Sequence, residues 1–142
     1  MKKSVLLVTT ALTLLFLLIL NTSAKQKQVG YYLEHEKDLA KEEGGPHDGL
    51  GKTTAHSFFA SATDSKLVFR KRILHPGSSI GYHLQKTEEI YYIVSGKGEM
   101  QMNGKTFPVE GGDAILTLPG NSHGLVQKGD DDLVVIINYN KQ

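Results

Sequence analysis

The chain has 142 residues, of which 16 are basic and 15 acidic, so its formal net charge is +1. This length suits one domain with its own core and is short for two. The near-neutral charge, with no basic stripe, argues against nucleic acid as a partner. The chain has no cysteine, which excludes disulfides, thiol catalysis and a lipid-modified N-terminal Cys.

The first 24 residues have the parts of a secretory signal peptide. Lys2 and Lys3 precede an apolar stretch from Val5 to Leu20, and Thr22-Ser23-Ala24 offers small residues for cleavage. We predict cleavage after Ala24, which gives an exported protein, periplasmic or extracellular, without a stable membrane anchor. The apolar stretch is slightly long for a signal and slightly short for a bilayer span, so an uncleaved N-terminal anchor is the alternative.

Residues 25–52 are predicted to form an N-terminal arm. They are polar, with a short helix expected around Tyr32–Glu42 and a loop from Gly44 to Gly51, where glycine and proline crowd together.

From Thr53 onward, short strands alternate with turn signals, a pattern typical of an all-β sandwich or barrel. Asn103-Gly104 is the strongest hairpin signal, because both residues tolerate positive φ angles. Pro76-Gly77 and Pro119-Gly120 mark two further turns. The predicted strands are Thr54–Phe59, Lys66–Leu74, Gly81–Gln85, Glu89–Ser95, Gly98–Met102, Lys105–Val109, Ala114–Leu118, His123–Gln127 and Leu133–Tyr139.

Three side chains that can bind metal fall close together, at His83, Gln85 and Glu89. Side chains two apart in a strand point to the same face, so His83 and Gln85 project together. Glu89 opens the next predicted strand across a short turn, and a hairpin brings all three groups together. His123 follows Pro119-Gly120 on a separate hairpin, and a closed barrel can deliver it to the same interior.

These residues resemble the first motif of the cupin superfamily, which is a Gly, five residues, His-x-His, three or four residues, Glu, six residues and Gly. The matching positions, with a glutamine in place of the second histidine, are Gly77, His83, Gln85, Glu89 and Gly96. The spacing to Gly96 selects Glu89 rather than Glu88 as the ligand. Glu88 is expected to face solvent.

The second cupin motif is a Gly, a Pro-x-Gly region, two residues, His, three residues and Asn. Its counterparts, with the proline moved by one place and a glutamine at the Asn position, are Gly112-Asp113, Leu118-Pro119-Gly120, His123 and Gln127. The resemblance covers Lys66 to Tyr139. It implies a double-stranded β-helix, the jelly-roll barrel, over residues 53–142, with a metal near its more open end.

The resemblance implies that His83, Gln85, Glu89 and His123 bind a divalent transition metal, which is Zn, Fe, Mn, Ni or Cu. Gln85 offers a neutral carbonyl oxygen, a weaker ligand than imidazole and one that suits harder ions. Zinc-dependent phosphomannose isomerases of this superfamily also use two His, one Glu and one Gln, in a different order. The alternative is a decayed site whose polar residues only line a pocket. The cost of burying Glu89 without a cation or hydrogen bonds favours the metal.

Two further residues are candidate catalytic groups. Strict alternation along Leu67–Ile73 puts Lys71 on the face of Phe69, and if that face lines the barrel Lys71 can bind an anion or move protons. A rim lysine that reaches water is the alternative. Tyr91 follows Glu89 on the inward face and can donate a hydrogen bond to a ligand, or serve only as a core aromatic.

His47, His56 and His75 are single histidines in the arm, an early strand and a turn, and we expect none to bind metal. The segment from His47 to Gly51 resembles a glycine-rich segment that precedes the barrel in some bacterial cupins. We expect it to give a tight turn before a strand that pairs with a second subunit. This arm and the habit of the family predict a homodimer.

Two functions fit these residues. The first is a metal-dependent enzyme of isomerase, lyase or dioxygenase type, acting on a small oxygenated molecule such as a sugar, a sugar acid or a dicarbonyl compound. The second is a non-catalytic, exported cupin that binds a small molecule or a carbohydrate. An outward Lys71 and a cavity without other acid–base groups would favour the second.

Overall fold

The computed structural model describes residues 30–141, and from Tyr32 onward they form one compact unit. The predicted signal peptide lies outside the described residues, so its cleavage stays a prediction. Among residues 30–141 there is no helix that is both long and apolar enough to cross a membrane.

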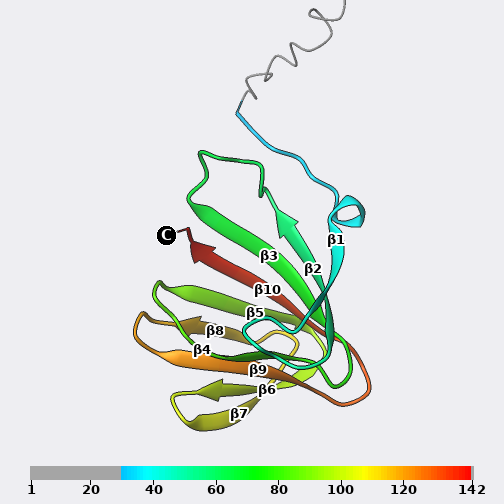
Figure 1. The fold of residues 1–142 in the computed structure, drawn as a ribbon, viewed down its shortest axis with the longest axis vertical. Coiled ribbons are helices and arrows are strands. Elements are labelled where there is room, and N and C mark those ends of the chain that lie inside the picture. The colour runs from blue at the N-terminus through cyan, green and yellow to red at the C-terminus, as the bar shows by residue number, and fades with distance from the viewer. Residues whose placement is uncertain (1–29, 142) are drawn as a thin grey trace, which may run out of the picture. The chain divides into compact units, whose positions relative to one another are not determined.

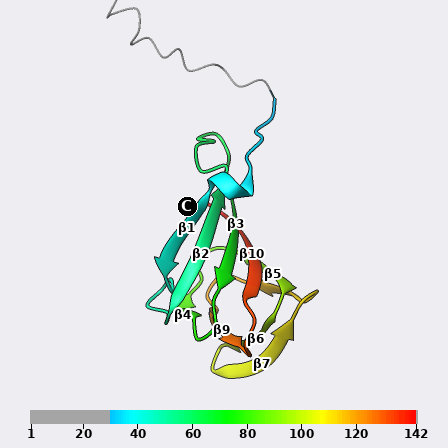
Figure 2. The ribbon, with the colours of Figure 1, turned by 90° about the vertical axis from the view of Figure 1, so that its right-hand side faces the viewer.

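The compact unit is built from two antiparallel sheets (Figures 1 and 2). The order of strands is β1-β2-β3-β10-β5-β8 in the six-stranded sheet and β4-β9-β6-β7 in the four-stranded sheet. The prediction of an all-β jelly-roll fold is thus confirmed. The strands are β1 (Ala40–Gly44), β2 (Lys52–Phe58), β3 (Leu67–Leu74), β4 (Ser79–Leu84), β5 (Glu89–Ser95), β6 (Lys97–Met102), β7 (Lys105–Glu110), β8 (Ala114–Thr117), β9 (Ser122–Lys128) and β10 (Leu133–Asn140).

The core lies between the two sheets and receives side chains from both. Its largest fully buried members include Leu74 on β3 and Ile93 on β5 from one sheet, and Met100 on β6 and Leu125 on β9 from the other. Because side chains alternate along a strand, each inward residue is followed by one that faces away from the core. Burial of this apolar surface is the main stabilising contribution to the barrel.

All nine predicted strands are present, with bounds that agree to within two residues. The Asn103-Gly104 hairpin is confirmed: φ is +48° at Asn103 and +79° at Gly104, and Met102 pairs with Lys105 across the turn. Gly77 and Gly120 also adopt positive φ, at +81° and +83°, as expected for the second residue of a Pro-Gly turn.

The helix predicted around Tyr32–Glu42 is wrong. The segment forms one short 3₁₀ turn, Glu36–Asp38, followed by β1, which pairs antiparallel with β2. The physical reason is that this polar segment has no apolar stripe to bury as a helix, whereas an edge strand gains backbone hydrogen bonds from the sheet. The residues expected to be an arm thus contribute an edge strand to the main sheet.

A buried arginine fixes β1 to the rest of the sheet. The guanidinium of Arg72 on β3 donates to Thr53 Oγ1 at 2.6 Å and to Glu43 Oε2 at 3.2 Å. Arg72 is 4 % exposed, so its charge requires this pairing. The pKa of the Glu43 carboxyl is lowered, chiefly by the hydrogen bond from Lys41 and further by the one from Arg72.

We predict that Glu43→Gln lowers the free energy of unfolding by about 1–2 kcal/mol at pH 7, because a charged hydrogen bond is lost. The folded-state pKa of Glu43 lies below its ordinary value of 4.5, so its contribution is complete above that pH and is lost as the pH falls through the folded-state value. Urea unfolding of both proteins between pH 3 and 7 measures the difference.

Glu42→Gln is the matched control, since it removes the same charge from the neighbouring, exposed residue of β1. It should leave the free energy of unfolding within about 0.5 kcal/mol of the parent. An equal loss in both variants, or a Glu43→Gln effect as large at pH 3 as at pH 7, would contradict the role given to Glu43.

Candidate metal centre

Three of the predicted ligands meet in the interior of the barrel. His83 on β4 and His123 on β9 are directly opposite each other in the four-stranded sheet. Glu89, the first residue of β5, reaches the same point from the other sheet. One ligand atom of each lies within 4.8 Å of the other two, and His123 Nε2 is 2.9 Å from Glu89 Oε2.

Each imidazole is oriented by a hydrogen bond at its outer nitrogen. His83 Nδ1 donates to the carbonyl oxygen of Gly81 at 2.8 Å, which assigns the proton to Nδ1 and leaves Nε2 as a free acceptor. His123 Nδ1 is 2.7 Å from Thr117 Oγ1, so its Nε2 is the nitrogen that faces the cluster. Such outer partners are typical of histidines that bind metal.

Gln85 completes the set predicted from the sequence. Its side-chain amide lies 3.2 Å from Nε2 of both His83 and His123 and in close contact with Glu89 Oε2. The two ends of an amide are exchanged by a half-turn about its last torsion, so the same position can present Oε1 to a cation. Three acceptor atoms and one amide therefore converge on one small volume.

The protonation states also suit a cation. Burial lowers the pKa of His83, and the nearby His123 lowers it further, against the hydrogen bond to Gly81, which raises it. A neutral imidazole is the form that binds metal. Glu89 is 5 % exposed and His123 is fully buried, which leaves the carboxylate without bulk water to solvate it. This donor set fits a divalent ion.

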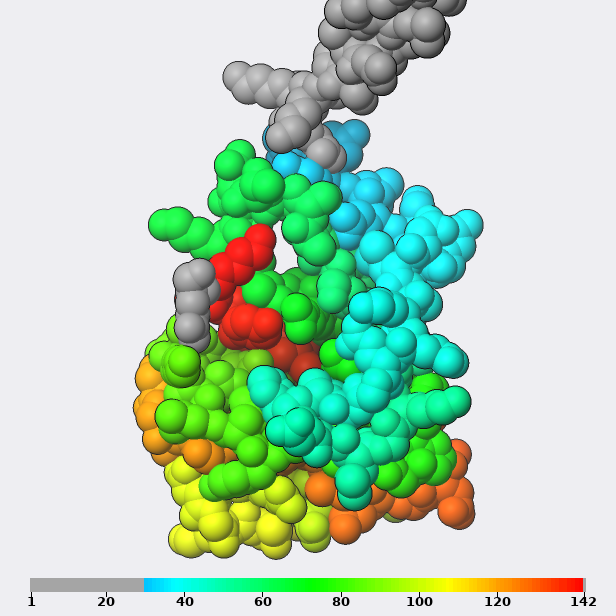
Figure 3. Space-filling view, in the orientation of Figure 1, coloured from blue at the N-terminus to red at the C-terminus, as the bar shows by residue number. Residues whose placement is uncertain are grey.

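A cavity of about 290 Å³ opens onto the cluster. It lies between the loop that contains Pro46 and His47, the turn of Lys86 and Thr87, and strand β10. Figure 3 shows this face of the molecule hollowed next to the red C-terminal strand. The volume is suited to a small molecule rather than to a polymer.

His47 is a site residue that the sequence analysis missed. Its ring stacks on the ring of His83, with the centroids 3.5 Å apart and the planes 4° from parallel. His47 and Asp48 both have positive φ, at +54° and +59°. A Cβ atom on Gly81 would collide with the carbonyl oxygen of His47, so the loop depends on that glycine. In the sequence, Gly81, two residues before His83, was the one sign that another segment approaches the backbone closely there.

Tyr91 lies on the inward face, as the alternation predicted. It is 2 % exposed, lines the cavity and packs against His123, with the ring centroids 4.9 Å apart. Burial raises the pKa of its hydroxyl far above the ordinary value, and the charge of Glu89 raises it further. The phenol is therefore protonated, and it can donate a hydrogen bond but cannot act as a base near neutral pH.

Of the two orientations considered for Lys71, the inward one is wrong. Its Nζ lies 2.6 Å from Glu36 Oε1, on the other face of β3, and it does not line the cavity. Arg70 and Arg72 face the cavity instead. The alternation was correct, but the buried face was assigned to the wrong set of residues: the apolar side chains of Leu67 and Phe69 lie on the outer face and are exposed.

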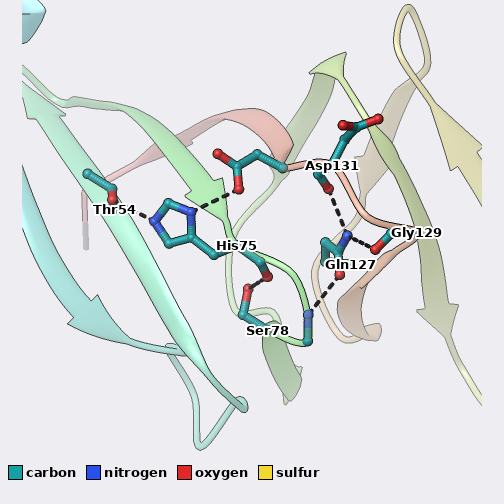
Figure 4. A network of polar contacts seen from close by, with 8 residues as sticks. Thr54, His75, Ser78, Gln127, Gly129 and Asp131 are labelled. Atoms are coloured by element: carbon teal, nitrogen blue, oxygen red, sulfur yellow. Dashed lines mark hydrogen bonds and ion pairs between the residues drawn. The ribbon is translucent and has the colours of Figure 1, made fainter.

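The last position of the second motif, Gln127, belongs to a structural network away from the metal ligands (Figure 4). Its Oε1 accepts from the backbone of Gly77 at 2.9 Å, and its Nε2 donates to the carbonyls of Gly129 and Asp131, both at 2.8 Å. Gln127 thereby ties the β3–β4 loop to the β9–β10 loop.

His56 and His75 lie outside the metal cluster, as expected. His75 is bound on both sides, with Nδ1 2.9 Å from Asp132 Oδ1 and Nε2 2.9 Å from Thr54 Oγ1 (Figure 4). His56 is buried, with its Nε2 3.8 Å from Glu36 Oε1.

Comparison with known proteins agrees with this fold. A family model described as a cupin domain matches residues 71–139. The chain is 41 % identical, over 81 residues, to an oxalate-binding protein of Thermotoga maritima, covering 56 % of this chain and 67 % of that one.

Solved structures of similar proteins have the same fold. A predicted oxalate decarboxylase from Thermotoga maritima superposes with a TM-score of 0.71 at 29 % identity, covering 78 % of this chain and all of that one. A polyketide cyclase from Streptomyces resistomycificus shares the fold, with a TM-score of 0.65 at 20 % identity. The match covers 80 % of this chain and 81 % of the cyclase. The chain is a member of the cupin superfamily.

Proposed function

We propose that this cupin binds a small carboxylate of the oxalate class through a divalent metal ion held by His83, Gln85, Glu89 and His123. The observation that carries the proposal is the convergence of these four side chains at the base of a small cavity. A divalent ion held there supplies positive charge and open positions for the oxygens of a ligand.

The class of the ligand rests on the relatives and on the size of the cavity. The curated relative is named for oxalate binding, and a solved neighbour is described as a predicted oxalate decarboxylase. A cavity of about 290 Å³ accommodates a molecule of this size. Two adjacent carboxylate groups match the hard oxygen chemistry that a site with a Glu and a Gln ligand favours.

Binding without turnover is the first candidate, and it is supported by the position of Lys71 outside the cavity. Lys86 and Tyr91 do line the cavity, so it is not free of acid–base groups. A metal-dependent enzyme of lyase, isomerase or dioxygenase type is the second candidate. The observation in its favour is Tyr91, a protonated phenol that lines the cavity and can donate a hydrogen bond to a reacting ligand.

We further propose that the protein is an exported homodimer. Export is supported by the composition of residues 1–24. The dimer is supported by an apolar patch on the outer face of the six-stranded sheet, where Phe69, Ile90, Tyr92 and Leu116 are 37–55 % exposed. These four side chains are uncharged, and the neighbouring Lys71 on the same face is paired with Glu36, so two copies can stack on the patch.

The metal proposal predicts that Glu89→Gln abolishes stoichiometric metal binding. The change keeps the shape of the side chain but removes its negative charge, and it should weaken affinity by more than about a hundredfold, beyond the usual effect of an outer partner. Elemental analysis of untagged protein after dialysis measures the bound metal.

The matched control for metal binding is Glu88→Gln, which makes the same change at the adjacent, exposed residue. It should retain one ion per chain. A parent protein without stoichiometric metal, or equal metal content in both variants, would refute the proposed metal site.

The proposed ligand predicts that oxalate binds only to the metal-loaded protein. Titration calorimetry should show one oxalate per chain, with the heat abolished by EDTA treatment and restored by dialysis against Mn²⁺ or Zn²⁺. The reason is that the buried carboxylate Glu89 repels an anion unless a cation lies between them. Equal binding to metal-free protein would contradict the proposal, and release of formate would favour the enzyme.

The dimer proposal predicts that Tyr92→Glu gives monomers in sedimentation velocity, because it puts two like charges into the proposed interface. Tyr82→Glu is the control, since Tyr82 is 50 % exposed on the other sheet. A monomeric parent protein, or a dimer that survives Tyr92→Glu, would contradict this interface.

A further inference from the structure

Arg70 brings a positive charge into the cavity that the proposed metal site leaves unexplained. It lies on the inward face of β3, lines the cavity, and has an Nε that is shielded from solvent yet without a hydrogen-bond partner among the described residues. An unpaired polar atom in such a place is costly. Arg72, two residues further on, is fully engaged by Thr53 and Glu43.

The strand register places Arg70 across the cavity from the metal ligands. Arg70 pairs with Ile137 on β10, which pairs in turn with Tyr91 on β5, two residues after Glu89. Two strand spacings, about 10 Å, therefore separate the backbone of Arg70 from that of Tyr91. A ligand between the side chains of these two strands can contact the ion at one end and the guanidinium at the other.

The balance of charge fits a dianion. A divalent ion and Glu89 together leave one positive charge, Arg70 adds a second, and the exposed Lys86 on the turn beside the cavity adds a third. The pairing of Arg72 with Glu43 contributes none. This excess of positive charge favours a ligand with two negative charges over one with a single charge.

We infer that Arg70 forms an anion subsite that binds the second carboxylate of a short dicarboxylate, whose first carboxylate lies at the metal. This inference rests on the proposed function. The planar guanidinium can donate two parallel hydrogen bonds to a carboxylate, which gives the subsite directional selectivity for that group.

The test compares the parent protein with Arg70→Gln and Arg70→Lys, each loaded with Mn²⁺, by titration with oxalate, malonate and, in competition, acetate. Arg70→Gln should weaken binding of both dicarboxylates by about ten- to a hundredfold while acetate affinity and metal content stay unchanged. Arg70→Lys keeps the positive charge but not the two parallel N–H donors of the guanidinium, and it should give an intermediate loss of dicarboxylate affinity. It also serves as the informative variant if Arg70→Gln is unstable.

Lys71→Gln is the matched control, because it removes the same charge from the adjacent residue on the opposite face of β3. It should bind all three ligands as the parent does. Dicarboxylate affinity that is unchanged in Arg70→Gln, or a loss equal for acetate and oxalate, would overturn the subsite alone. A metal-loaded parent protein that binds none of the three carboxylates would overturn the proposed function, and the subsite with it.

Discussion

The burial of the Glu89 carboxylate is the constraint on which the rest of the site depends. The side chain is almost fully shielded from water, and its polar neighbours in the described chain are His123, Gln85 and the hydroxyl of Tyr91. A carboxylate in such a place requires positive charge or several donors. Both imidazoles have their outer nitrogens committed elsewhere and direct Nε2 inward. The cluster is thus arranged as a receptor for a cation.

The barrel provides this arrangement by bringing ligands from its two sheets to one point. The pairing of His83 with His123 comes from the four-stranded sheet, and Glu89 comes from the six-stranded one. The loop from Gly45 to Gly51 packs against β4, where Pro46 O accepts from the backbone of Gly81 at 2.9 Å, and it brings His47 onto His83. The N-terminal segment therefore shapes the mouth of the cavity as well as extending the sheet.

The sequence predicted the strands and the ligand cluster because both depend on local patterns. Alternation, the Asn103-Gly104 turn and the spacing from His83 to Glu89 are all encoded within short segments. The failures concern long-range contacts. The segment that forms β1 was assigned partly to a helix and partly to a loop, because local composition does not show that it pairs with β2. The position of His47 depends on a close approach between two backbones, and the orientation of β3 depends on which of its faces the second sheet covers.

The orientation of β3 also changes the chemistry. It places Lys71 on the outer face and Arg70 and Arg72 on the side of the cavity. Arg72 is paired with Glu43, so Arg70 is the guanidinium of β3 that can bind an anion. This orientation favours recognition of a carboxylate over acid–base catalysis.

The most direct test of the metal site is a crystal structure of the protein loaded with Mn²⁺, with anomalous scattering used to locate the ion. The account predicts one strong anomalous peak per chain, bounded by Nε2 of His83 and His123, a carboxylate oxygen of Glu89 and the amide oxygen of Gln85. A peak elsewhere, or none at this position in crystals of the loaded protein, would contradict it.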